Sequence, residues 1–253
     1  MIKNPFRAIC SVSLALLSGI VSLALPASAD GSLIFNTSDS PFTPGVANQG
    51  WWTSTYANED REQNYAVGRS ADLGGVEFRN FFSFDLRSLD LEGLTIVGAT
   101  LELRRYQYLS PDPTETLEFH DVSTAAAILN NNVGTSATIF DDLGSGVSYG
   151  SFVVSESGAG TETLSFSLNS AAISDIVAAA GDSFFSIGGA VRSLGETSDN
   201  ELLFAYSFPD GCGGVQRLLI DTQFTAVPEP GTGLWAIGLL LSMALRPSRR
   251  RQA

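Results

Sequence analysis

The sequence predicts a mainly β protein: an antiparallel two-sheet β-sandwich of jelly-roll type with one or two short helices. From residue 32 onward, short runs of alternating apolar and polar residues are separated by Gly, Pro, Asn, Asp and Ser, which is the pattern of strands joined by turns. About 200 residues lie between two terminal targeting segments, enough for one domain with a full core. A parallel α/β fold would need a helix between most strands, and the pattern contains no such series.

The clearest strands are 76–86 and 96–108, where apolar residues recur at every second position. The side chains expected to face the core are those of Phe82, Phe84, Leu86, Ala99, Leu101 and Leu103. Pro111 and Pro113 end the second strand, and we expect 117–122 to return beside it as a hairpin partner. The other expected strands are 33–35, 51–56, 64–69, 147–154, 162–168, 183–191, 201–208 and 215–224.

Two segments depart from the strand pattern. Residues 123–131 contain the run Ala-Ala-Ala-Ile-Leu, which favours one or two helical turns. A clearer helix follows Asn169 or Ser170, either of which can cap its first turn, and Gly181 ends it.

The N-terminus is typical of a secretory signal peptide covering residues 1–29. Two basic residues precede a long apolar stretch, and Ala27 and Ala29 supply the small residues that flank a cleavage site. The mature chain would then begin at Asp30. The alternative is a retained N-terminal anchor.

The charge distribution excludes two classes of partner. All 27 acidic residues lie between Asp30 and Glu229, where only eight arginines and no lysine occur, so this part carries a net charge of −19. Nucleic acids and anionic lipids require a basic surface, so we expect neither as a ligand of the domain.

The residues that usually carry catalysis are scarce. His120 is the only histidine, and the alternation of its strand predicts that it faces outward beside Glu118. A Gly-x-Ser-x-Gly spacing occurs at 146–150, but it falls at the start of the expected strand 147–154 and not at the strand-to-helix turn that a nucleophile elbow requires. Once Cys10 leaves with the signal peptide, Cys212 is the only thiol, so zinc sites and an intramolecular disulfide are excluded. We therefore expect no enzymatic activity.

The C-terminus combines three features within 25 residues. The proline-flanked sequence Val-Pro-Glu-Pro is expected to stay extended, the uncharged run 231–245 can form a helix in lipid, and an arginine cluster follows it. The residues of this segment that we expect to matter are Val227, Pro228, Glu229, Pro230, Arg246, Arg249, Arg250 and Arg251. A buried core helix is the alternative for the apolar run, because fifteen residues span only ~22 Å against a hydrocarbon core of ~30 Å.

We call the Val-Pro-Glu-Pro sequence, residues 227–230, the sorting handle. The order of sorting handle, apolar helix and basic end resembles the PEP-CTERM sorting signal. The resemblance implies an exosortase-type membrane processing enzyme as partner, a transient membrane anchor, and a final place at the cell surface or in an extracellular polysaccharide matrix. It divides the chain into a signal peptide (1–29), an extracellular β-sandwich domain (30–226) and a sorting segment (227–253). Whether the C-terminal helix is cleaved or kept stays open.

A second, weaker resemblance concerns the domain itself. The block 78–86 followed by 96–103 is similar to jelly-roll modules of secreted bacterial proteins, some of which bind carbohydrate. Trp51, Trp52 and Tyr56 are candidates for stacking on sugar rings. Adjacent strand residues point to opposite faces, so at most one tryptophan would be exposed; core packing of both requires a strand covered on each side.

Acidic residues also cluster in expected loops at 59–62, 141–142 and 199–201. No segment gathers the six to eight oxygens that calcium takes, so a calcium site would have to be assembled from separate loops. We expect no cofactor other than a possible structural calcium.

The leading hypothesis is a non-enzymatic exported protein sorted through its C-terminal segment. A carbohydrate-binding module, with or without calcium, is the first alternative. The second is a glycoside-active enzyme, which would require a cleft lined by two carboxylates.

Overall fold

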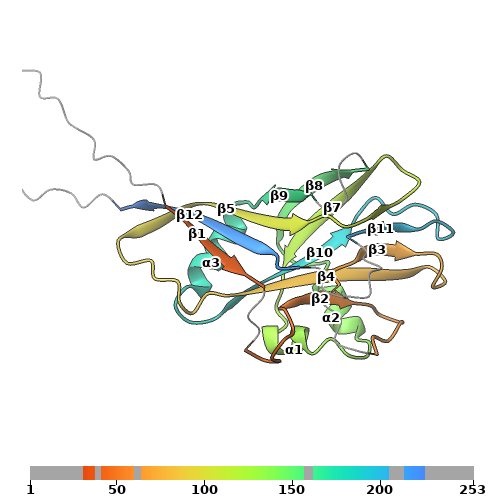
Figure 1. Ribbon diagram of the computed structural model, residues 1–253, viewed down its shortest axis with the longest axis horizontal. Coiled ribbons are helices and arrows are strands. Elements are labelled where there is room, and N and C mark those ends of the chain that lie inside the picture. Colours follow the sequence, from red (N-terminus) through yellow and green to blue (C-terminus); the bar gives the residue numbers. More distant parts are fainter. Residues whose placement is uncertain (1–30, 38–40, 60–63, 157–161, 205–213, 226–253) are drawn as a thin grey trace, which may run out of the picture.

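The computed structural model describes residues 31–37, 41–59, 64–156, 162–204 and 214–225. These residues form strands and short helices that pack into one body (Figure 1). The strands are β1 (Gly31–Asn36), β2 (Gln49–Trp52), β3 (Val67–Ser70), β4 (Val76–Asp85), β5 (Leu94–Arg104), β6 (Tyr108–Leu109), β7 (Thr114–Asp121), β8 (Ser148–Ser155), β9 (Thr163–Ser167), β10 (Phe184–Val191), β11 (Glu201–Leu203) and β12 (Arg217–Phe224). The helices are α1 (Ala126–Asn130), α2 (Ala137–Asp142) and α3 (Ser170–Ala179).

The strands belong to two antiparallel sheets, as the sequence predicts. The smaller sheet has the order β1-β12-β5-β9. The larger has the order β6-β11-β3-β4-β10-β7-β8, and β2 pairs with β4 as well. The helices expected near residues 123–131 and after Asn169 are present as α1 and α3. The short helix α2 is a third one that the sequence pattern did not indicate.

One hydrophobic core joins the two sheets. All six side chains expected to face inward from 76–86 and 96–108 are buried in it. Phe119 of β7 and Phe166 of β9 meet edge to face across the sandwich, with ring centroids 5.3 Å apart. Helix α3 closes one end, since Ala172 and Ile176 are fully buried in the same cluster.

The predicted hairpin between 96–108 and 117–122 is wrong. β5 pairs with β12 and β9, whereas β7 pairs with β10 and β8 in the other sheet. After Arg104 the chain leaves the smaller sheet and pairs briefly with β11 as β6, then enters β7. Both strands bury alternate residues, so their alternation could not reveal that they lie in different sheets.

A second layer covers the outer face of the larger sheet. Helices α1 and α2 lie beside β2 and β4 (Figure 1). Arg79 of β4 donates to the carbonyl of Phe140 in α2 at 2.9 Å and stacks on its ring. Gly188 of β10 permits close approach of the following turn, because a Cβ there would lie 2.5 Å from the carbonyl oxygen of Leu143. Phe81 and Ser83 of β4 are therefore buried on this outer face as well.

Both targeting segments lie outside the described residues. This applies to the signal-peptide residues Ala27, Ala29 and Asp30, to the sorting segment 227–253, and to Cys212. Within the described part of the chain, no helix is long and apolar enough to span a membrane.

Truncating a core side chain should destabilise the sandwich. We expect Leu101→Ala, at a fully buried position between the sheets, to lower the free energy of unfolding by about 2–5 kcal/mol in urea titrations. Val153→Ala is the matched control, since this side chain is 71% exposed and should change stability by less than about 0.5 kcal/mol. Equal effects of the two substitutions would contradict the core assignment.

Candidate functional site

The two tryptophans proposed as a sugar platform are both buried. Trp51 and Trp52 are 6% and 5% exposed. They point to opposite faces of β2, as adjacent strand residues must. On one face Trp51 packs edge to face on Phe78, with ring centroids 4.9 Å apart, and contacts Leu202. The strand is thus covered on this side.

The other face of β2 is covered by the helical layer. Trp52 packs with Phe81, Leu129 and Leu143, and its indole nitrogen donates to the carbonyl of Leu129. The strand is covered on each side, so the alternative in which both tryptophans pack internally holds, and Trp51 and Trp52 do not form an exposed platform. Tyr56 is 41% exposed and is the one member of the group with substantial accessible surface, so glycan contact stays a prediction for Tyr56.

His120 does not face solvent as expected. It lies on the outer face of β7 beside Glu118, but only 4% of it is exposed. The turn after α2 covers it, and Arg192 bridges the two by donating to the carbonyl of Gly144 and to Nε2 of His120, both at 2.6 Å. The same guanidinium pairs with Glu118 at 2.8 Å. His120 was expected to face solvent because the sequence pattern did not indicate α2, and the turn after that helix covers the histidine.

The surroundings of His120 suit a structural role. A guanidinium can only donate, so the Arg192 contact requires Nε2 of His120 to accept, whereas the Glu118 carboxylate, 3.3 Å from the same nitrogen, would require it to donate. Nδ1 is buried and has no hydrogen-bond partner among the described residues. Burial, and then the positive charge of Arg192, lower the pKa of His120 below its usual value. No hydrogen bond described for this ring reaches a hydroxyl group that could act as a nucleophile.

A cluster of three carboxylates, which sequence spacing did not reveal, lies where β6, β7 and β11 meet. Asp112, Glu115 and Glu201 have oxygen atoms within 4.8 Å of one another, and the two glutamates are each 1% exposed. Gly68 of β3 makes the approach of β11 possible. Its φ is +116°, and a Cβ there would lie 1.9 Å from the carbonyl oxygen of Glu201.

The buried carboxylates of this cluster already have donors. Glu201 accepts from the backbone N–H of Gly195 at 2.6 Å and pairs with Arg69 at 3.4 Å. Glu115 accepts from the hydroxyls of Ser110 and Ser193. Each of these bonds satisfies an oxygen that a cation would otherwise use.

The cluster therefore fits a calcium site poorly. Calcium takes six to eight oxygens, and three carboxylates next to a guanidinium leave few of their lone pairs available. Glu115 and Glu201 line none of the four cavities described. We interpret the cluster as a structural polar network, in which the Arg69–Glu201 pair holds β11 on β3 and Glu115 of β7 holds the segment after β10 through Ser193.

The acidic loops that the sequence singled out also serve local structure. Asp142 accepts hydrogen bonds from the backbone and hydroxyl groups of Ser123 and Thr124, at 2.6–3.2 Å. Asn200 accepts from the backbone of Ala71 at 2.8 Å. Glu59 is exposed, and the rest of the 59–62 cluster lies outside the described residues.

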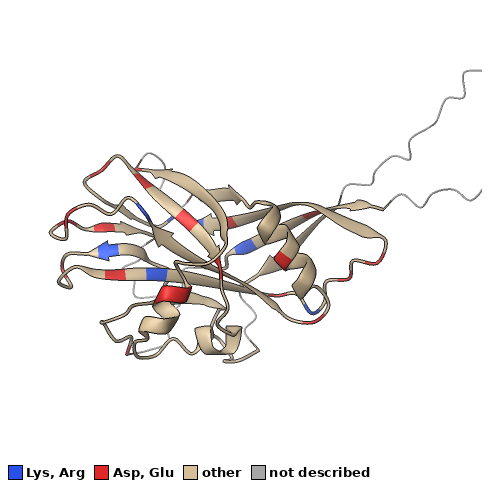
Figure 2. Cartoon of the chain, turned by 180° about the vertical axis from the view of Figure 1, so that it is seen from behind, with Lys and Arg blue, Asp and Glu red and all other residues tan. Residues whose placement is uncertain are grey.

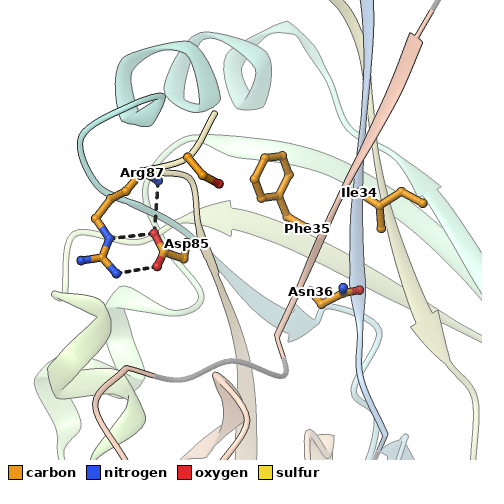
Figure 3. Close-up of a pocket in the computed structure, with 6 residues that line it drawn as sticks. Ile34, Phe35, Asn36, Asp85 and Arg87 are labelled. Carbon is orange, nitrogen blue, oxygen red and sulfur yellow. Dashed lines mark hydrogen bonds and ion pairs between the residues drawn. The ribbon is translucent and has the colours of Figure 1, made fainter. Parts of the chain in front are cut away.

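An open groove of about 580 Å³ lies between β1 and the end of β4. Figure 3 shows Phe35 directed into it and Ile34 directed away from it, with Asp85 and Arg87 on the opposite side. Arg87 donates twice to Asp85, at 2.6 and 2.8 Å, and this interaction holds the pKa of Asp85 below its usual value. The two charges neutralise each other, so the groove offers no free charged group.

A smaller cavity, of about 310 Å³, is lined by two further carboxylates. Asp175 accepts from the hydroxyl of Tyr149 at 2.7 Å, and Asp121 accepts from the backbone of Val147 at 2.6 Å. Both groups therefore hold neighbouring segments of the chain together.

The comparison with protein families identifies the C-terminus. A family model described as the PEP-CTERM protein-sorting motif matches residues 226–251. This confirms the resemblance on which the sequence interpretation rests, and the match contains every residue expected to matter in the segment. No curated protein matches the chain.

The buried ion pair of the carboxylate cluster should contribute more to stability than an exposed pair. Arg69→Met leaves Glu201 buried without its cation, and we expect a loss of about 3–5 kcal/mol in the free energy of unfolding. Arg87→Met breaks a pair whose side chains are 52% and 32% exposed and screened by solvent, and it should cost clearly less stability than Arg69→Met. Equally small losses would show that the buried pair is not stabilising.

The contribution of Asp142 should depend on pH. Burial opposes ionisation, but the hydrogen bonds from Thr124 and Ser123 outweigh it and hold the pKa of Asp142 below its usual value. Its stabilisation is therefore present above the unfolded pKa of about 3.9 and lost as pH falls through the folded pKa. Asp142→Asn should destabilise the protein at pH 7, and its deficit should shrink below about pH 4 in urea titrations. A deficit independent of pH would contradict this.

Proposed function

We propose that this chain is an exported, non-enzymatic protein whose sandwich domain is carried to the cell surface or the extracellular polysaccharide matrix. An exosortase-type enzyme would process its C-terminal segment at the membrane. The observation that carries the proposal is the match of residues 226–251 to the PEP-CTERM protein-sorting motif.

The physical properties of the segment support this role. Pro228 and Pro230 fix the backbone around Glu229 and keep it available for recognition. The uncharged run 231–245 is short for a permanent anchor but sufficient for a temporary one, and Arg246 can extend towards the interface. The arginines that follow resist translocation and fix the orientation of the helix.

The strand order supports a jelly roll for the exported domain. Eight strands make up the two layers once β2, β3, β6 and β11 are set aside. Numbered 1 to 8 along the chain, they have the order 1-8-3-6 in the smaller sheet (β1-β12-β5-β9) and 2-7-4-5 in the larger sheet (β4-β10-β7-β8). This is the arrangement of two antiparallel four-stranded layers with Greek-key connections, to which β2, β3, β6 and β11 add a lateral extension.

The absence of enzymatic activity is supported by how the polar groups are used. His120 is enclosed by Arg192 and the turn after α2. Glu115 and Glu201 are bound to internal donors away from the described cavities. These groups hold secondary-structure elements together, so a display or matrix role accounts for them without a substrate.

The proposal is tested by changing the sorting segment in the native host. Deleting 227–253 should release or mislocalise the protein, and Glu229→Ala should leave an unprocessed precursor in the membrane fraction. Glu196→Ala, at an exposed position in the domain, is the matched control. Cell fractionation and mass spectrometry of the mature C-terminus report the result. Unchanged surface localisation after the deletion would refute the proposal.

A further inference from the structure

The folded domain ends immediately before the sorting handle. The last pair of the smaller sheet joins Phe224 of β12 to Leu94 of β5. Thr225 is also held, because its backbone N–H donates to the carbonyl of Gly93 at 2.8 Å and its hydroxyl lies 3.1 Å from that of Thr95. The chain therefore leaves the sandwich at one fixed point, at the end that carries the β4–β5 loop (Figure 1).

The distance from this point to the membrane is limited by the sequence. Pro228 is three residue steps beyond Thr225, and residue 231 is six steps beyond it. At full extension these steps span at most about 10 and 21 Å. If 231–245 lies in the hydrocarbon core, headgroups occupy roughly 6 Å of the longer distance. The gap that remains between the domain and the headgroups is roughly 15 Å.

An enzyme that holds the handle must therefore touch the domain. Because Pro228 lies within about 10 Å of Thr225, any protein surface that encloses Pro228 to Pro230 meets the end of the sandwich. We define this end as the exit face: Asp90, Glu92 and Gly93 of the β4–β5 loop, together with Phe224 and Thr225. Phe224 is 63% exposed there.

The charge of the exit face indicates the chemistry of its partner. Asp90 and Glu92 are exposed, and Asp182 lies beside the start of the same loop, since Gly181 donates to the carbonyl of Leu86. Figure 2 shows red, acidic segments on the loops at the end of the domain from which the chain leaves. The one arginine described in the loop, Arg87, is neutralised by Asp85. Anionic lipid would be repelled by such a surface, whereas a basic protein surface would be attracted.

We propose that the exit face is a docking surface for a basic, water-exposed surface of the membrane processing enzyme. This inference rests on the proposed function, and it adds that the folded domain is part of what the enzyme recognises. The short connection forces the contact, the acidic side chains orient it, and Phe224 supplies an apolar centre.

The test reverses the charge of the exit face in the full-length chain. In the native host, Asp90→Lys with Glu92→Lys should slow conversion of precursor to processed protein by at least about tenfold in pulse–chase measurements. Glu196→Lys with Asp199→Lys is the matched control, because these exposed residues lie in the β10–β11 loop at the opposite end of the sandwich (Figure 1). Thermal unfolding of each variant shows that it is folded.

A linker separates direct contact from other effects. Ten Gly and Ser residues inserted between Thr225 and Ala226 remove the enforced contact, so they should restore most of the rate lost by charge reversal. Equal rates for the reversed and control variants at native spacing would overturn the docking surface, as would a deficit that the linker leaves unchanged. Processing of the wild-type chain would still support the proposed function in those cases. If the wild-type chain is not processed at all, both proposals fail.

Discussion

The structure depends on β4 being buried on both faces. Its inner face supplies Phe82 and Phe84 to the core between the sheets, and its outer face places Phe81 beneath the helical layer. β2, β3 and β10 all pair with this strand, so it connects the core to everything built around it. The enclosure of the tryptophans and of the histidine follows from this double coverage.

Local pattern predicted the sandwich well because it records which side chains avoid water. Leu101 and Leu103 alternate with polar neighbours, and they are buried as expected. Alternation does not say which sheet receives a strand, so the partner of β5 was assigned wrongly. It also cannot show that a polar face is covered: α2 is only six residues long, yet the turn that follows it encloses His120. Glu115 and Glu201 lie close together in the fold but far apart in the chain, so local sequence spacing cannot predict that they are neighbours.

The arginines of the domain are used almost entirely for internal ion pairs. Among the described residues, Arg69, Arg79, Arg87, Arg105, Arg192 and Arg217 each pair with a carboxylate. Several of the remaining described acidic side chains, among them Asp90, Glu92 and Asp182, are exposed, and the described acidic residues outnumber the arginines, so the surface field of the domain is negative. A negative field disfavours contact with anionic surfaces and leaves cations and basic proteins as the partners that electrostatics favours.

The position of β12 sets an order of events for an exported chain. It lies between β1 and β5, so the smaller sheet stays divided until the final residues of the domain are available. Only Ala226 and Val227 separate Thr225 from the first proline of the handle. A chain that emerges from its N-terminus therefore completes its hydrophobic core at nearly the moment its sorting segment emerges. Folding of the domain and exposure of the sorting segment therefore occur close together in time. A chain that has not fully emerged has neither a complete domain nor an accessible sorting segment.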